Sequence, residues 1–126
     1  MRVYIGGAYN GKVAVVEKAL QRLDEQQALW LDAKLPEQGT NLVVVNNLHL
    51  WLKSFEGTEE QAIEKVKQSI ENRPSFVILT DIGSGIVPME RAERVYRDLV
   101  GRVYQALIQD ADEVFQVWYG LTKQIK

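Results

Sequence analysis

The stretch RVYIGGAYNGKV, residues 2–13, decides the fold. Its first five residues, 2–6, include β-branched and aromatic side chains and end in glycine, which predicts a short strand. From Lys12 to Asp24 the apolar residues recur at helical spacing, so we expect a helix there. A glycine-rich loop therefore joins a strand to a helix.

This loop has the spacing G-x-x-x-x-G-K of a phosphate-binding loop, with Gly6, Gly11 and Lys12 at the fixed positions. Glycines allow the backbone N–H groups to point at phosphate oxygens, and the N-terminus of the following helix attracts the anion. The residue after the lysine normally offers a hydroxyl to Mg²⁺, but Val13 has no oxygen. The alternative is a glycine turn that binds nothing. The predicted nucleotide-binding residues here are Gly6, Gly7, Ala8, Tyr9, Asn10, Gly11, Lys12 and Val13.

Strands and helices alternate along the rest of the chain. The runs NLVVVN and SFVILTD are continuously apolar, as in strands buried on both faces of a sheet. Thr58 and Gln61 form a capping-box pattern that starts a helix. Besides 2–6, we expect strands at 28–32, 41–46, 75–81 and 114–120. Besides 12–24, we expect helices at 47–55, 58–72 and 89–109.

Such alternation predicts a single α/β domain, residues 1–126, with a mostly parallel sheet between two layers of helices. Ligands of these sheets bind beyond the carboxyl ends of the strands. The loops 6–13, 46–49 and 81–88 each follow a strand. We therefore expect them to converge on one site.

Composition narrows the function classes. The chain has 126 residues, 46% hydrophobic and 25% charged, as in a soluble globular domain. The net charge of −2 and the lack of a basic run argue against nucleic-acid binding. No apolar stretch approaches the roughly 20 residues of a membrane span. The chain has no cysteine, which fits a cytoplasmic protein, and its one histidine, His49, excludes a multi-histidine metal site.

Residues 81–121, DIGSGIVPMERAERVYRDLVGRVYQALIQDADEVFQVWYGL, resemble the adenosylcobinamide kinase / adenosylcobinamide-phosphate guanylyltransferase family. The segment VVVNNLHLWL and the loop GGAYNGKV also resemble segments of that family, in the same order. The matching positions in the long segment are Gly83, Gly85, Ile86, Val87, Pro88, Arg94, Arg97, Asp98, Gly101, Gln105, Ala111, Asp112 and Val114.

The resemblance implies a P-loop NTPase-like three-layer α/β fold, a homo-oligomer such as a trimer, and a role in cobalamin biosynthesis. It implies phosphorylation of a corrinoid hydroxyl, on adenosylcobinamide, with GTP or ATP, followed by GMP transfer. Lys12 and Asp81 would be the catalytic residues, with Asp81 as base or as a metal ligand through water. Gly83 and Gly85 would bring backbone N–H groups to the nucleotide. Arg94 and Arg97 would contact phosphate or a subunit, unless they belong to a solvated helix face.

The chain departs from the family pattern at functional positions. Val13 replaces a Ser, and Asn46 replaces the Asp that anchors Mg²⁺, so the metal is expected although its usual ligands are missing. The family has a longer segment with a histidine that accepts GMP, whereas residues 25–40 contain no histidine. His49 matches a family Thr, and we interpret it as structural rather than catalytic. Kinase chemistry is therefore favoured over GMP transfer, because it needs positioning more than a covalent nucleophile.

Two alternatives remain open. One is a catalytically degenerate relative that serves as a nucleotide-binding or partner subunit on the same scaffold. The other is an unrelated α/β protein with a chance glycine loop. Trp51 and Trp118 are expected in the core or at an interface.

Overall fold

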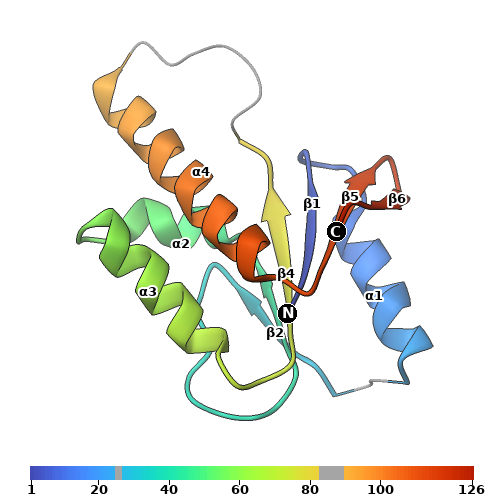
Figure 1. Cartoon of the computed structure of the whole chain (residues 1–126). Helices are drawn as coiled ribbons and strands as arrows, with labels where there is room; N and C mark the ends of the chain where they lie inside the picture. The colour runs from blue at the N-terminus through green and yellow to red at the C-terminus, as the bar shows by residue number, and fades with distance from the viewer. Residues whose placement is uncertain (25–26, 83–89) are drawn as a thin grey trace.

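A six-stranded sheet is the centre of the computed structural model, which describes residues 1–24, 27–82 and 90–126 (Figure 1). The strand order is β2-β3-β4-β1-β5-β6. Strands β1 to β5 run parallel to their neighbours, and β6 runs antiparallel to β5. The strands are β1 (Arg2–Gly6), β2 (Leu29–Asp32), β3 (Val43–Asn46), β4 (Ser75–Thr80), β5 (Glu113–Trp118) and β6 (Leu121–Gln124).

Helices cover both faces of this sheet. Helix α1 lies on one face, and α2, α3 and α4 lie on the other (Figure 1). The predicted α/β architecture, three layers with a mostly parallel sheet, is confirmed. The helices are α1 (Lys12–Arg22), α2 (Leu48–Ser54), α3 (Glu59–Ile70) and α4 (Arg91–Asp110). Within the described ranges, no helix has the length and apolarity needed to cross a membrane.

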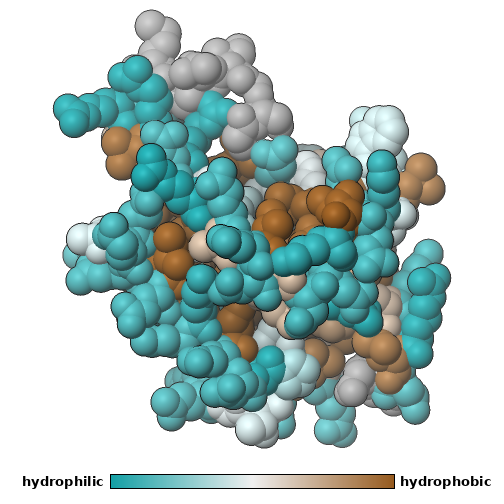
Figure 2. Space-filling model, in the orientation of Figure 1, coloured by the Kyte–Doolittle hydropathy of each residue, from teal (hydrophilic) through white to brown (hydrophobic). Residues whose placement is uncertain are grey.

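Two apolar clusters pack the layers together, one on each face of the sheet. Val43 and Val45 join the cluster under α2, α3 and α4, whereas Val44 joins Val16 of α1 on the opposite face. Successive strand residues point to opposite faces, and all three valines are buried. This explains why NLVVVN is continuously apolar. On the face seen in Figure 2, hydrophilic residues cover most of the surface and hydrophobic residues form smaller patches.

The capping box predicted for the third helix is present. The Thr58 hydroxyl accepts a hydrogen bond from the Gln61 backbone N–H at 3.1 Å, and the Gln61 side chain accepts one from the Thr58 N–H at 2.8 Å. Both bonds satisfy donors that a helix start would otherwise leave unpaired.

The end of the chain corrects one expectation. Residues 114–120 were expected to be the last strand, but β5 and β6 form a hairpin. Its turn residues Tyr119 and Gly120 have φ of 49° and 75°, and positive φ at both positions is typical of a two-residue hairpin turn. Every residue of β6 is exposed, so the strand has no buried apolar residue to reveal it. Trp118 is 63% exposed and does not belong to the core, whereas Trp51 is half-buried against it.

Candidate functional site

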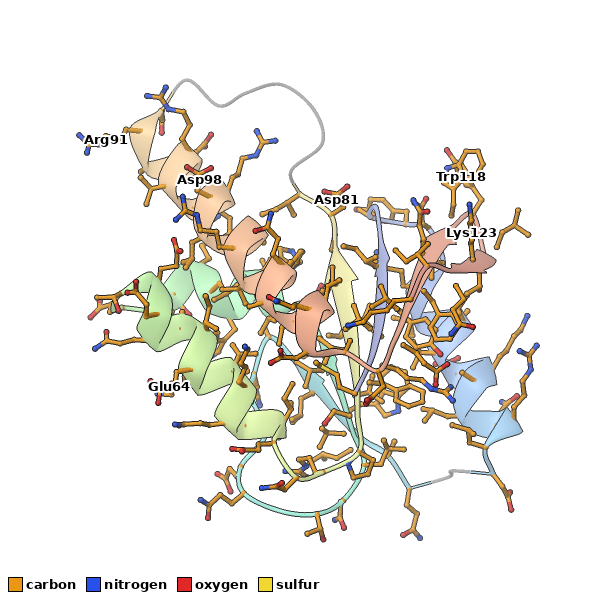
Figure 3. All side chains as sticks on the ribbon, in the orientation of Figure 1. Glu64, Asp81, Arg91, Asp98, Trp118 and Lys123 are labelled. Carbon is orange, nitrogen blue, oxygen red and sulfur yellow. The ribbon has the colours of Figure 1, made fainter. Side chains whose placement is uncertain are left out.

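The parallel strands bring their carboxyl ends to one edge of the sheet. Gly6, the last residue of β1, pairs in register with Thr80, the last residue of β4. Asp81 directly follows β4, and its backbone N–H donates to the Gly6 carbonyl at 2.9 Å. Figure 3 shows Asp81 at the same edge of the sheet as Trp118, which ends β5. The ends of β1, β4 and β5 thus lie along one edge of the sheet.

A pocket of about 430 Å³ opens at this edge, and we call it the loop pocket. Residues 8–14 line it from the glycine loop and the start of α1. Asn46, Asn47 and His49 line it from the β3–α2 segment, and Ile78 and Thr80 line it from β4. Six of the eight loop residues predicted to bind nucleotide, those from Ala8 to Val13, are in its wall.

The Lys12 ammonium group lies inside the curve of the glycine loop. Lys12 is only 7% exposed, and its Nζ donates to the Gly7 carbonyl oxygen at 2.6 Å. Burial lowers the pKa of Lys12. A buried cation with few partners favours an incoming anion. The structure thus places a positive charge where the sequence motif predicts one.

The loop backbone leaves several N–H groups without partners among the described residues. Gly11 has φ of 82°, which favours glycine, and it precedes the first residue of α1. Within the described parts of the chain, the N–H groups of Ala8, Tyr9, Asn10 and Gly11 donate no hydrogen bond. The Asn10 carbonyl accepts a bond from the Gly120 N–H at 2.8 Å, so the β5–β6 turn supports the loop from behind. Unpaired amides beside a helix start suit phosphate oxygens.

The described residues at this edge do not fit a Mg²⁺ site built from protein ligands. Val13 lines the pocket but has no oxygen on its side chain. The Asn46 side-chain oxygen already accepts a bond from the Asn47 N–H at 2.9 Å. Asp81 carries a carboxylate, but it is not among the residues that line the loop pocket. No catalytic step is therefore assigned to a metal here.

A second pocket of about 560 Å³ lies between α2 and α4, and we call it the helix pocket. Leu50 and Lys53 of α2 line it, as do Tyr96 and Arg97 of α4. His49 lines both this pocket and the loop pocket. The two pockets are therefore neighbours.

The environment of His49 is unusual for a structural residue. Its Nδ1 atom is buried and has no hydrogen-bond partner among the described residues. Burial lowers the pKa of His49, and the positive charge of Lys12 lowers it further. The backbone carbonyl of His49 accepts a bond from the Tyr96 hydroxyl at 2.5 Å, which ties α2 to α4.

Comparison with known proteins identifies the family. The family model described as "Cobinamide kinase / cobinamide phosphate guanyltransferase" matches residues 18–125. The chain belongs to this family. The match begins after the glycine loop, so the family model does not cover residues 6–13. We infer a binding site there from the geometry of the loop. The resemblance inferred from the sequence is confirmed, and the fold is the P-loop-type α/β sandwich expected for a member of the cobinamide kinase family.

Two bacterial relatives of this cobinamide kinase family member share part of its sequence. The "Bifunctional adenosylcobalamin biosynthesis protein CobU" of Escherichia coli is 41% identical over 73 residues, which are 53% of this chain and 40% of the relative. The protein of the same name from Salmonella typhimurium is 36% identical over 75 residues, 58% of this chain and 41% of the relative. The chain thus matches about two fifths of the length of these curated relatives.

The remaining residues predicted from the family resemblance are spread over the site. Arg97 lines the helix pocket rather than the loop pocket, and Arg94 is exposed and lines neither. Gly83 and Gly85 lie outside the described residues. Tyr104 donates its hydroxyl to the Thr80 carbonyl at 2.8 Å and so fixes α4 against the end of β4.

Sequence reasoning missed Asn47 and Tyr96 as site residues. Asn47 has φ of 57° and directly precedes α2, and it donates its side-chain amide to the Asp32 carboxylate at 2.6 Å. The pair Asn46–Asn47 directly after a buried strand is a signal for such a turn. For Tyr96 the sequence offers no signal, because its contact with His49 spans 47 residues.

Proposed function

We propose that this protein binds the phosphates of GTP or ATP in the loop pocket. We propose further that it serves adenosylcobalamin biosynthesis as a kinase-like member of its family, phosphorylating a hydroxyl of a corrinoid such as adenosylcobinamide. One observation carries the proposal: the Lys12 ammonium is buried behind a loop whose amides from Ala8 to Gly11 donate to no described group.

The arrangement suits phosphoryl transfer. That reaction depends chiefly on positioning the nucleotide and stabilising the charge on its phosphates. Lys12 supplies the charge, and the loop amides and the start of α1 supply oriented donors. Asp81, at the end of β4, is the carboxylate we propose as base. Gly83, Gly85, Arg94 and Arg97 remain proposed nucleotide contacts.

GMP transfer, the second reaction that the family resemblance implies, is not part of the proposal. The family route needs a histidine nucleophile in a segment that this chain replaces with residues 25–40, and those contain no histidine. The single histidine, His49, matches a different family position. We therefore propose the kinase step without the guanylyltransferase step.

A turnover assay tests the proposal. Adenosylcobinamide is incubated with GTP or ATP, with and without Mg²⁺, and the phosphorylated corrinoid is separated by chromatography and identified by its mass. The wild type and Lys18→Ala, which alters an exposed lysine of α1, should form product. Lys12→Ala should form none. Equal product from Lys12→Ala and the wild type would refute a catalytic role for the loop.

A second function is favoured by Val13 and Asn46, which leave the usual metal positions without their oxygen ligands. On this reading the protein is a catalytically degenerate nucleotide-binding or partner subunit in the cytoplasm. It would bind GTP or ATP equally well with a chelator present and form no phosphorylated corrinoid. In either case we propose a homo-oligomer, and the trimer that the family suggests would have a mass in solution of about three times 14.4 kDa.

A further inference from the structure

His49 lies where the loop pocket and the helix pocket meet. It is the one side chain that lines both pockets in the described part of the chain. Its neighbour in the loop pocket is Lys12, whose positive charge acts on the imidazole. Its neighbours in the helix pocket include Leu50 and Tyr96. A ligand in either pocket is therefore adjacent to the same imidazole ring.

The wall between the pockets is fixed in place. The Tyr96 hydroxyl donates to the His49 carbonyl at 2.5 Å, so the first turn of α2 is attached to α4. The Tyr96 ring also lies 5.9 Å from the Lys53 ammonium, in the range of a cation–π contact. Residues on both sides of the helix pocket thus hold each other in position, which favours a preformed site.

The helix pocket has the lining of a site for a largely apolar molecule. Leu50, Ile82, Ala92 and the Tyr96 ring provide its apolar surface. Leu50 is 46% exposed, so a ligand that covers it removes apolar surface from water. Lys53, Glu93 and Arg97 also line the pocket and offer charged groups to polar substituents on the ligand.

We propose that the helix pocket binds the acceptor of the transferred phosphoryl group, with an apolar part of that molecule against Leu50 and Tyr96 and its hydroxyl directed at His49. The inference rests on the proposed function, because it assigns the second substrate of the same site. Group transfer requires the two reacting atoms to come within roughly 3–3.5 Å of each other. The helix pocket shares His49 with the nucleotide pocket, so a ligand in it lies next to the site where the nucleotide would bind. His49 is thus a positioning residue that contacts both ligands.

The single histidine makes this inference directly measurable. The imidazole C–H signals in an NMR spectrum of the full chain all come from His49. Dicyanocobinamide, a diamagnetic corrinoid with a hydroxyl-ended side arm, is the acceptor probe, and GTP with chelator is the nucleotide probe. Each is added alone. We expect each to shift the His49 signals.

Two variants of equally exposed leucines separate the pockets. Leu50 and Leu23 are each 46% exposed, but Leu23 follows α1, away from the helix pocket. Leu50→Asp should weaken dicyanocobinamide binding at least tenfold and leave the GTP response intact. Leu23→Asp should behave as the wild type. The inference is overturned if dicyanocobinamide leaves the His49 signals unchanged, or if it binds Leu50→Asp as tightly as Leu23→Asp.

The Lys12→Ala variant distinguishes failure of the inference from failure of the proposed function. It should lose the GTP response and keep the dicyanocobinamide response. A GTP response that is absent in the wild type both with chelator and with Mg²⁺ would contradict the proposed function, while a dicyanocobinamide response that depends on Leu50 would still support the helix pocket as a corrinoid site.

Discussion

The Nζ atom of Lys12 lies 2.6 Å from the carbonyl oxygen of Gly7, so the lysine reaches back across its own loop. An ammonium group has three N–H donors, and among the described residues only this carbonyl accepts one of them. Two donors remain for an anion that enters the loop. The loop therefore combines a held cation with backbone amides that have no partner in residues 1–24, 27–82 and 90–126, which is the physical basis of the proposed phosphate site.

Replacing Gly6 or Gly101 by alanine should change the stability of the fold in opposite directions, because only Gly6 is tightly packed. A Cβ atom on Gly6 would overlap the carbonyl oxygen of Val117, whereas a Cβ on Gly101 of α4 would meet nothing within 4 Å. Gly6→Ala should lower the free energy of unfolding by about 2–3 kcal/mol, because the backbone must shift. Gly101→Ala should raise it by about 0.5–1 kcal/mol, because alanine favours helix. Urea denaturation measures both, and a neutral Gly6→Ala would contradict the packing.

Removing the capping box of α3 should cost less stability than Gly6→Ala. Thr58→Ala removes the hydroxyl that accepts from the Gln61 N–H, and should lower the free energy of unfolding by about 1 kcal/mol. Thr40→Ala, at an exposed loop position, is the matched control and should change it little. Thermal unfolding of both variants side by side gives the comparison. Equal midpoints would mean that the cap does not stabilise α3.

The features of the fold that depend on residues close together in the chain could be predicted from the sequence. The buried run of Val43, Val44 and Val45 and the Thr58 cap are set by neighbours in the chain, and both predictions are confirmed. Strand β6 was missed because its four residues are all exposed, although Tyr119–Gly120 is a turn signal.

In the candidate site, too, the part built from adjacent residues could be predicted and the part built from distant segments could not. The strand, the glycines and the helix of the loop motif follow one another directly in sequence, so the strand–loop–helix arrangement around Lys12 could be predicted, while the binding role of Lys12 stays a prediction. The helix pocket was not predicted, because it forms only when α4 packs on α2 and brings Tyr96 to His49. Periodicity within each helix identifies its apolar face but not the partner that this face meets.

The environment of His49 predicts an acid-shifted titration. Burial and the Lys12 charge both disfavour the imidazolium, so its pKa in the folded chain lies below the ordinary 6.5. Stability linked to this group is present above the unfolded value and lost as pH falls through the lowered pKa. The charged groups Lys53, Glu93 and Arg97 also line its pocket. Lys12→Met removes a positive charge and should raise the pKa of His49, as measured by NMR titration of the single imidazole.

The control for that titration is Lys18→Met, which removes an exposed lysine of the same helix. It should leave the His49 titration midpoint where it is in the wild type. A midpoint that does not move in Lys12→Met would show that the two groups do not interact.

Adding a hydroxyl at position 13 should make GTP binding depend more strongly on Mg²⁺. Val13 is 40% exposed and lines the loop pocket, so Val13→Thr adds an oxygen without disturbing the core. The ratio of GTP affinity with Mg²⁺ to that with chelator should rise about tenfold, the equivalent of one favourable polar interaction near 1.4 kcal/mol. Val95→Thr, on exposed α4 surface, should leave the ratio unchanged. An unchanged ratio in Val13→Thr as well would mean that no metal approaches this position.

Calorimetric titration with GTP and with ATP, in Mg²⁺ and in chelator, tests the central claim most directly. The wild type and Lys18→Ala should bind at least one nucleotide. Lys12→Ala should bind it at least about 30-fold more weakly, because a charged hydrogen-bond donor contributes about 2 kcal/mol. Equal affinity in Lys12→Ala, or no binding of either nucleotide by the wild type, would contradict the assignment of this loop as a phosphate site.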